Sequence, residues 1–243
     1  MKKNKMNVLI LLFAFIASGS VYATDNSVTF RVENMTCGGC SGKIKKTVSA
    51  IDGVSGFEAN LEKRVVTIAY DNQKVNFGQL KEAIAAIKYN AEDYDPNEVI
   101  ARKVSFKANQ IGCGGCVAKV KKNIGAEAGV IGVEVDLPTK EVKVEYDANK
   151  IASKEIQKDF QKFNYTVVRY WTSEKVKYAI LKVELLNDPA EVEKNLAAEK
   201  GILDVSVNEK TKDIAIAYNA TVIAEENLAD SIKKYNLNLV AEN

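Results

Sequence analysis

Apolar residues along this chain follow two rhythms in turn, first with a period of two and then with a period of three to four. Residues 28–32 alternate and are rich in β-branched side chains, which predicts a strand. The next segment places its apolar residues on one helix face, and both rhythms then recur. The apolar positions of the two helices predicted first are Ile44, Val48 and Ile51, then Leu80, Ile84 and Ile87.

This succession occurs three times at nearly fixed spacing, so the chain is built from internal repeats. A shift of 76 residues superimposes the first copy on the second, and a further shift of 72 residues reaches the third. The aligned positions include Gly53, Gly129 and Gly201, then Tyr70, Tyr146 and Tyr218. We predict repeat one over residues 26–95, repeat two over 102–170 and repeat three over 176–243.

Each repeat is predicted to contain a strand, a helix, two strands around a turn, a helix and a strand. In repeat one the turn falls at residues 61–64 and the last strand at 91–94, and Gly53 is predicted to end the first helix as a C-cap. This order predicts an α+β fold of three tandem ferredoxin-like βαββαβ domains. Each domain would have a four-stranded antiparallel sheet with two helices on one face.

The first 23 residues predict an export signal rather than a folded element. Three lysines precede an apolar run over residues 8–17, which is too short to span a bilayer. The small-x-Ala pattern at residues 21–23 predicts cleavage after Ala23. The expected product is a soluble protein, secreted or periplasmic, with no membrane insertion after signal cleavage.

Without that segment the net charge is close to zero, because 31 of the 34 basic residues remain against 32 acidic ones. Such a protein has no net field to attract nucleic acid, so no nucleic acid partner is expected. The chain also has no histidine, which closes many common catalytic mechanisms. We find no nucleophilic triad, phosphate loop or carboxylate pair, so the protein is not expected to be an enzyme.

The four cysteines form two Cys-Gly-Gly-Cys loops, Cys37 with Cys40 and Cys113 with Cys116. Each loop follows the first strand of its repeat and opens a predicted helix. A bridge between cysteines this close restrains little of an unfolded chain, so the pairs are interpreted as chemical rather than structural. The N-terminus of a helix favours the thiolate form, and two thiolates can turn toward one ion.

Two thiolates in an open loop suit a soft ion of low coordination number, which favours Cu(I) or Hg(II). Zn(II) and Cd(II) also accept thiolate pairs, although zinc prefers four ligands. Gly38 and Gly39 are expected to let the backbone bend closely around that ion. In an oxidising compartment the cysteines would have to be kept reduced, or metallated, to bind it.

The segment Met35-Thr36-Cys37-Gly38-Gly39-Cys40 within a βαββαβ repeat resembles the heavy-metal-associated (HMA) domain family. That family includes copper chaperones, amino-terminal domains of copper-transporting P-type ATPases and the periplasmic mercury-binding protein. The resemblance implies three HMA-like domains, the third degenerate, in a protein for metal trafficking, sequestration or resistance. It also implies a metal-transporting ATPase or another metal-carrier protein as a partner.

Three further residues are expected to support the two sites without binding metal. Met35 lies two residues before Cys37, but Ile111 takes its place in repeat two, so Met35 is predicted to be a core residue. Tyr89 and Tyr165 align with the aromatic residue that the family places beside its metal loop. They can also fill the edge of the core, and the two roles are compatible.

Repeat three has no cysteine pair, because Leu185 and Asp188 occupy the equivalent positions. The sequence from Asp188 instead predicts a capped helix start, with Asp at the N-cap, Pro189 at the first helical position and Glu191 at the third. The first helix of repeat three is acidic, whereas those of repeats one and two are rich in lysine. We therefore hypothesise that repeat three docks against one of those basic helices and masks or steers a metal loop.

Two other functions stay open on the sequence. A Cys-x-x-Cys at a helix start also occurs in thiol–disulfide oxidoreductases, although the βαββαβ order and the absence of a suitably placed proline argue against that class. Alternatively, the repeats could recognise a partner protein without any metal function. Titration with Cu(I) distinguishes this protein-recognition hypothesis from metal binding.

Overall fold

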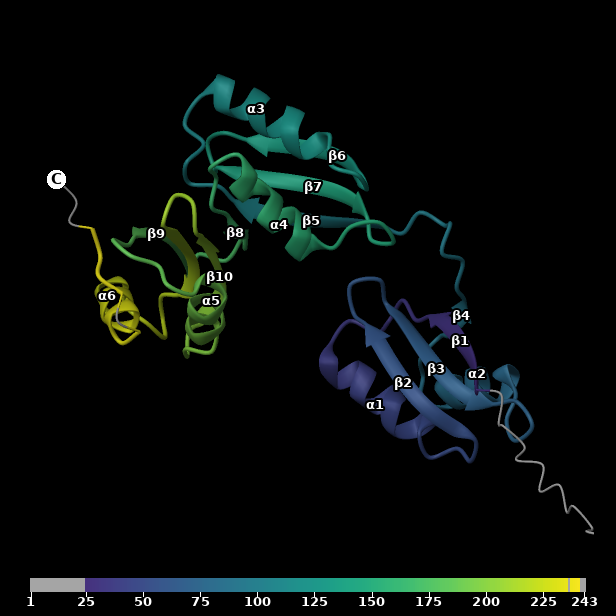
Figure 1. The fold of residues 1–243 in the computed structure, drawn as a ribbon. Helices are drawn as coiled ribbons and strands as arrows, with labels where there is room; N and C mark the ends of the chain where they lie inside the picture. The colour runs from purple at the N-terminus through teal and green to yellow at the C-terminus, as the bar shows by residue number, and fades with distance from the viewer. Residues whose placement is uncertain (1–24, 236, 241–243) are drawn as a thin grey trace, which may run out of the picture.

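The structure is a computed structural model that describes residues 25–235 and 237–240. The predicted signal segment, residues 1–23, lies outside these residues. Within them the chain forms three successive α+β units, and an extended connection separates the first unit from the other two, which lie side by side (Figure 1). None of the helices in these ranges has both the length and the apolar character needed to cross a bilayer.

The order of elements follows the predicted repeat. Repeat one contains β1 (Asp25–Arg31), α1 (Gly38–Val48), β2 (Val54–Asn60), β3 (Val65–Asp71), α2 (Phe77–Ala86) and β4 (Glu92–Asp93). Repeat two contains β5 (Ala101–Lys107), α3 (Gly114–Gly125), β6 (Val130–Asp136), β7 (Glu141–Asp147), α4 (Ser153–Lys162) and β8 (Val168–Arg169). Repeat three contains β9 (Val176–Lys182), α5 (Pro189–Ala197), β10 (Ile202–Asn208), β11 (Asp213–Asn219) and α6 (Glu225–Lys233).

The sheets are antiparallel, which confirms the predicted fold class. Strands follow the order β2-β3-β1-β4 in repeat one and β6-β7-β5-β8 in repeat two. In repeat three the described strands follow the order β10-β11-β9, and the place of the fourth strand is taken by a single bridge between Val183 and Leu239. The third sheet is therefore the least complete of the three.

Both helices of a repeat cover the same face of its sheet. In repeat one, Val66 and Ile68 of β3 are fully buried against Ile44 of α1 and Leu80 of α2. Burying an aliphatic side chain of this size contributes about 1.5–3 kcal/mol. The alternation read from the sequence therefore identifies the core face of each sheet correctly.

The prediction that Gly53 caps the first helix is wrong. Helix α1 ends at Val48, Ser49 is its C-cap, and Gly53 lies in the turn that leads into β2. Gly53 has a φ of +97°, and a Cβ there would come within 2.7 Å of the Lys74 Cβ. The equivalent Gly129 and Gly201 both have a φ of +95°, so this turn requires glycine in every repeat.

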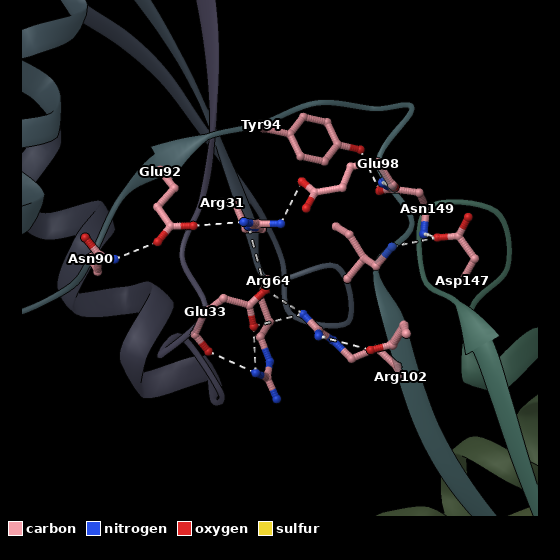
Figure 2. Close-up of polar contacts among 12 residues, drawn as sticks. Arg31, Glu33, Arg64, Asn90, Glu92, Tyr94, Glu98, Arg102, Asp147 and Asn149 are labelled. Atoms are coloured by element: carbon pink, nitrogen blue, oxygen red, sulfur yellow. Dashed lines mark hydrogen bonds and ion pairs between the residues drawn. The ribbon is translucent and has the colours of Figure 1, made fainter.

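Polar contacts join repeat one to repeat two (Figure 2). Glu33, just after β1, accepts hydrogen bonds from Arg64 of its own repeat at 2.9 Å and from Arg102 of β5 at 3.0 Å. Burial opposes ionisation of Glu33, but the hydrogen bonds and charges of Arg102 and Arg64 outweigh it and lower its pKa. Arg31 binds Glu98 of the connecting segment at 2.7 Å, so the connection is also tied to repeat one.

A second contact between these repeats involves Glu62 in the β2–β3 turn. Its carboxylate accepts hydrogen bonds from the Tyr146 hydroxyl and from the backbone N–H of Ser153, the first residue of α4. A carboxylate at a helix N-terminus is favourably placed, because the first N–H groups there have no partner within the helix. Burial and the bond to Glu62 raise the pKa of Tyr146, so its hydroxyl stays protonated as a donor.

Repeat three packs against repeat two with the outer face of its sheet, the face turned away from its own helices. Ile214 and Ile216 of β11 point into the core of repeat three, whereas Ala215 and Ala217 lie against Val168 of β8. The β11 sequence Asp-Ile-Ala-Ile-Ala-Tyr-Asn is small or apolar at both sets of alternate positions between its polar ends. Both faces of this strand are therefore buried.

Candidate metal site

Both cysteine pairs lie at the start of the first helix of their repeat and have the same geometry. Cys37 is the N-cap of α1, with φ −147° and ψ 160°, and its Sγ accepts a hydrogen bond from the Cys40 N–H at 3.2 Å. Cys113 has the same dihedral angles at the start of α3, and its Sγ accepts from the Cys116 N–H at 3.1 Å. The first cysteine of each pair thus takes the capping role that usually falls to serine or aspartate.

The two sulfurs of each pair are joined as a disulfide in the structure, with 5.1 Å between the Cα atoms. The loop therefore brings both sulfurs to one point, and reduction of this bond would yield the dithiol that a metal ion needs. Cys37 and Cys113 are exposed, whereas Cys40 and Cys116 are half-buried against the core. The first cysteine of each pair is thus open to an incoming ligand, and the second packs against the core.

The expectation that Gly38 and Gly39 bend the backbone around an ion is wrong. Both lie in the first turn of α1, whose helical backbone is accessible to any residue. A Cβ at Gly38 would meet nothing within 4 Å, and one at Gly39 would lie 3.9 Å from the Cys37 Sγ. Gly115 has the same relation to Cys113. These glycines leave the surroundings of the exposed sulfur open.

The residues predicted to support the sites occupy the edge of the core. Met35 and its counterpart Ile111 are fully buried, which agrees with the packing role predicted for Met35. Tyr165 is buried in the core of repeat two, and the Lys119 ammonium of α3 lies 5.5 Å from its ring centroid. Tyr89 is half-buried at the equivalent edge of repeat one.

Each loop supplies two sulfur donors, those of its own cysteine pair. Among residues 25–235 and 237–240, no group of three or more cysteine, aspartate or glutamate side chains is placed to hold a metal ion. In repeat three Leu185 is 62% exposed, and Asp188 is the N-cap of α5, accepting from the Glu191 N–H at 2.9 Å. The predicted exchange of a metal loop for ordinary helix capping is thus seen in the structure.

The predicted docking of repeat three on a basic first helix is wrong in its location. Glu193 of α5 pairs with Lys154 at 2.7 Å, and Lys154 belongs to α4, the second helix of repeat two. Repeat three does reach the metal loop of repeat two, but through Gln110, which donates to Asp213 of β11 at 3.0 Å. Charge alone could not have located this contact; the apolar outer face of β11 was the available signal.

The sequence model of the heavy-metal-associated domain matches residues 29–102 and 105–166, more than half of the chain. The chain belongs to the heavy-metal-associated domain family. The matched segments contain both cysteine pairs and correspond to repeats one and two.

Among curated relatives, the probable copper-transporting ATPase HMA5 of Arabidopsis thaliana is 23% identical over 84% of this chain and 21% of its own length. The chain therefore spans about a fifth of that ATPase. The mercuric transport protein periplasmic component of Shigella flexneri is 34% identical, covering 32% of this chain and 90% of that protein. The copper chaperone CopZ of Staphylococcus aureus is 43% identical over 22% of this chain and 78% of its own length.

Similar solved structures include the oxidised form of MerP from Ralstonia metallidurans CH34. It is 30% identical and has a TM-score of 0.28, covering 29% of this chain and 99% of that one. A CopZ metallochaperone structure is 35% identical with a TM-score of 0.27, covering 27% of this chain and 98% of that one.

Proposed function

We propose that this protein is an exported carrier of a soft metal ion for trafficking, sequestration or resistance. Cu(I) is the first choice of cargo and Hg(II) the second, because the relatives include copper and mercuric proteins. The ligands are the reduced sulfurs of Cys37 and Cys40 in repeat one and of Cys113 and Cys116 in repeat two. Repeat three is a degenerate copy of the same domain without a site.

The observation that carries this proposal is the shared geometry of the two cysteine pairs at a helix N-terminus. A sulfur at that position already accepts a backbone hydrogen bond, and the positive end of the helix dipole further favours the thiolate. With two sulfurs as the local donor set, a soft ion that accepts two-coordinate binding fits best.

The exposure of the first cysteine gives the site a route for exchange. A thiolate of a metal-transporting ATPase or of another carrier can approach the metal beside Cys37 or Cys113, while the half-buried second sulfur keeps its position. The ion passes between sulfur pairs without any change in its oxidation state. The protein acts as a binding module in this scheme and catalyses no reaction.

Titration of the reduced protein with Cu(I), against a competing chelator of known affinity, tests the proposal. We expect two equivalents to bind, and one equivalent after Cys113→Ser with Cys116→Ser. Serine keeps the N-cap acceptor, so this double variant should remain folded. Equal binding after serine replacement of all four cysteines would refute the proposed ligands.

Export is tested separately by sequencing the amino terminus of the protein secreted or released from the periplasm. A chain that begins at Thr24 agrees with cleavage after Ala23. A chain that retains residues 1–23 and stays inside the cell contradicts the proposed localisation.

A further inference from the structure

Repeats two and three meet in an interface with an apolar centre and a polar border. Val168 of β8 packs against Ala215 and Ala217, and Trp171 and Tyr178 extend the cluster. At the border Gln157 of α4 donates to Asp204 at 2.9 Å, although Gln157 is only 2% exposed. A buried polar side chain that finds its partner in another repeat indicates a specific docking geometry.

The same border continues to the metal loop of repeat two. Gln110, three residues before Cys113, accepts a hydrogen bond from the Thr166 N–H at 2.7 Å through its side-chain oxygen. Its side-chain nitrogen donates to the Asp213 carboxylate at 3.0 Å. Asp213 is 8% exposed, so this bond is largely shielded from water. One side chain of the loop is thus held by its own repeat and by repeat three.

Repeat one shows what this position does without a third repeat beside it. Asn34, the equivalent of Gln110, accepts from the Asn90 N–H at 3.3 Å and donates to the Lys88 carbonyl at 3.0 Å. Both partners of Asn34 therefore belong to repeat one. The extra methylene of Gln110 lets its nitrogen reach beyond its own repeat, and the acceptor changes from a local carbonyl to a carboxylate.

We infer that Asp213 of repeat three is a positioning residue for the metal loop of repeat two, acting through Gln110. The inference rests on the proposed metal function of Cys113 and Cys116. A loop held at Gln110 loses less conformational freedom when its cysteines close on an ion, which strengthens binding and slows release. In repeat one Asn34 makes both of its bonds within its own repeat, so it is the second site whose exchange depends on repeat three, which has no ligand of its own.

Amide hydrogen exchange on the reduced, metal-free full chain tests the positioning role without reference to metal. Asp213→Ala is expected to speed exchange of the backbone amides at residues 109–112 by about tenfold, the factor for losing one hydrogen bond to a carboxylate. Asp213→Asn keeps an acceptor at this position and should restore most of the protection. The amides of residues 33–36 in repeat one serve as an internal reference and should not change.

A second experiment measures metal transfer, with protein in which Cys37→Ser and Cys40→Ser leave only the second site. Transfer of Cu(I) from this site to a competing chelator should accelerate by up to about tenfold in the Asp213→Ala variant. Lys154→Ala is the matched control, because it removes an ion pair of the same interface that involves no residue of the loop, and it should leave both readouts unchanged. Gln110→Ala removes the other partner of the bond, and it replaces Asp213→Ala if that variant does not fold.

Unchanged exchange at residues 109–112 in both Asp213→Ala and Gln110→Ala would overturn the positioning role, even if Cu(I) binds as proposed. Acceleration by Lys154→Ala equal to that by Asp213→Ala would also overturn it, since the effect would then come from general loosening of the interface. If Cu(I) does not bind at all, the proposed function fails, while the exchange data still decide whether Asp213 holds the loop.

Discussion

The two junctions between repeats are built from different interactions. Repeat one meets repeat two through ion pairs and hydrogen bonds, centred on Glu33 with Arg102 and on Glu62 with Tyr146. Repeat two meets repeat three through a buried apolar cluster around Ala217, with polar contacts at its border. Apolar burial involves no charges that salt could screen or pH could titrate, whereas exposed ion pairs are weak and screened.

This difference indicates that the two junctions differ in rigidity. Repeats two and three should behave as one body, whereas repeat one should change its position more easily. The three predictions below test this comparison, from the largest expected effect to the smallest.

Ala217→Lys should separate repeat three from repeat two. Ala217 is fully buried in the junction, and a lysine there would place a charge without a partner against Val168, at a cost of about 3 kcal/mol. Small-angle scattering should show a larger radius of gyration, and amides of β11 should exchange faster. Glu145→Lys places lysine at the equivalent, partly exposed position of repeat two, where it loses an ion pair with Lys103, and should cost less than about 1 kcal/mol. Equal behaviour of the two variants would remove the distinction between the junctions.

Tyr146→Phe should weaken the junction between repeats one and two by about 1–1.5 kcal/mol, because it deletes the hydrogen bond to the Glu62 carboxylate. A fluorescence-transfer pair placed in repeats one and two should report a broader distance distribution, while a pair in repeats two and three should not change. Tyr70→Phe makes the same change at the equivalent position of repeat one and is the control. A Tyr146→Phe protein with the parent distance distribution would show that this bond does not hold the junction.

Acid should loosen the junction of repeat one by less than about 1 kcal/mol, after allowance for solvent screening. The pKa of Glu33 lies below its ordinary value of 4.5, so its contribution is complete above that pH and is lost as the pH falls through the lower folded pKa. The same distance measurement between pH 7 and pH 3 should show the change. Glu33→Gln should show less of this dependence, and an identical pH profile in both proteins would exclude Glu33 as its source.

Local sequence was sufficient to predict the elements of repeats one and two and those of repeat three up to its last strand, which among the described residues is a single bridge. Apolar periodicity located the strands and helices, and Asp188 followed by Pro189 predicted the start of α5 at the residue where it occurs. It failed at the end of α1, because the helix-like spacing continues from Val48 to Ile51 although the backbone has left the helix. An apolar residue in a turn packs on the same core as one in a helix, so periodicity does not separate them.

Sequence also predicted the cysteine pairs at helix starts, but it assigned Gly38 and Gly39 a role in bending that the structure does not support. Their backbone is helical, and a Cβ at either position would meet no atom closer than 3.9 Å, so neither the backbone nor the packing requires glycine there. The place of Gly39 beside the Cys37 sulfur is a property of the folded loop, which spacing along the chain does not determine.

The sequence by itself determined the repeat, the fold of each repeat and the positions of the two cysteine pairs, because these depend on residues close together in the chain. Only the tertiary structure decided which surface of repeat three meets repeat two, and that this contact reaches the loop before Cys113. The bond between Gln110 and Asp213 joins residues 103 positions apart. Pairing across such a distance depends on how two folded domains fit together. The signal for it in the local sequence is the apolar outer face of β11.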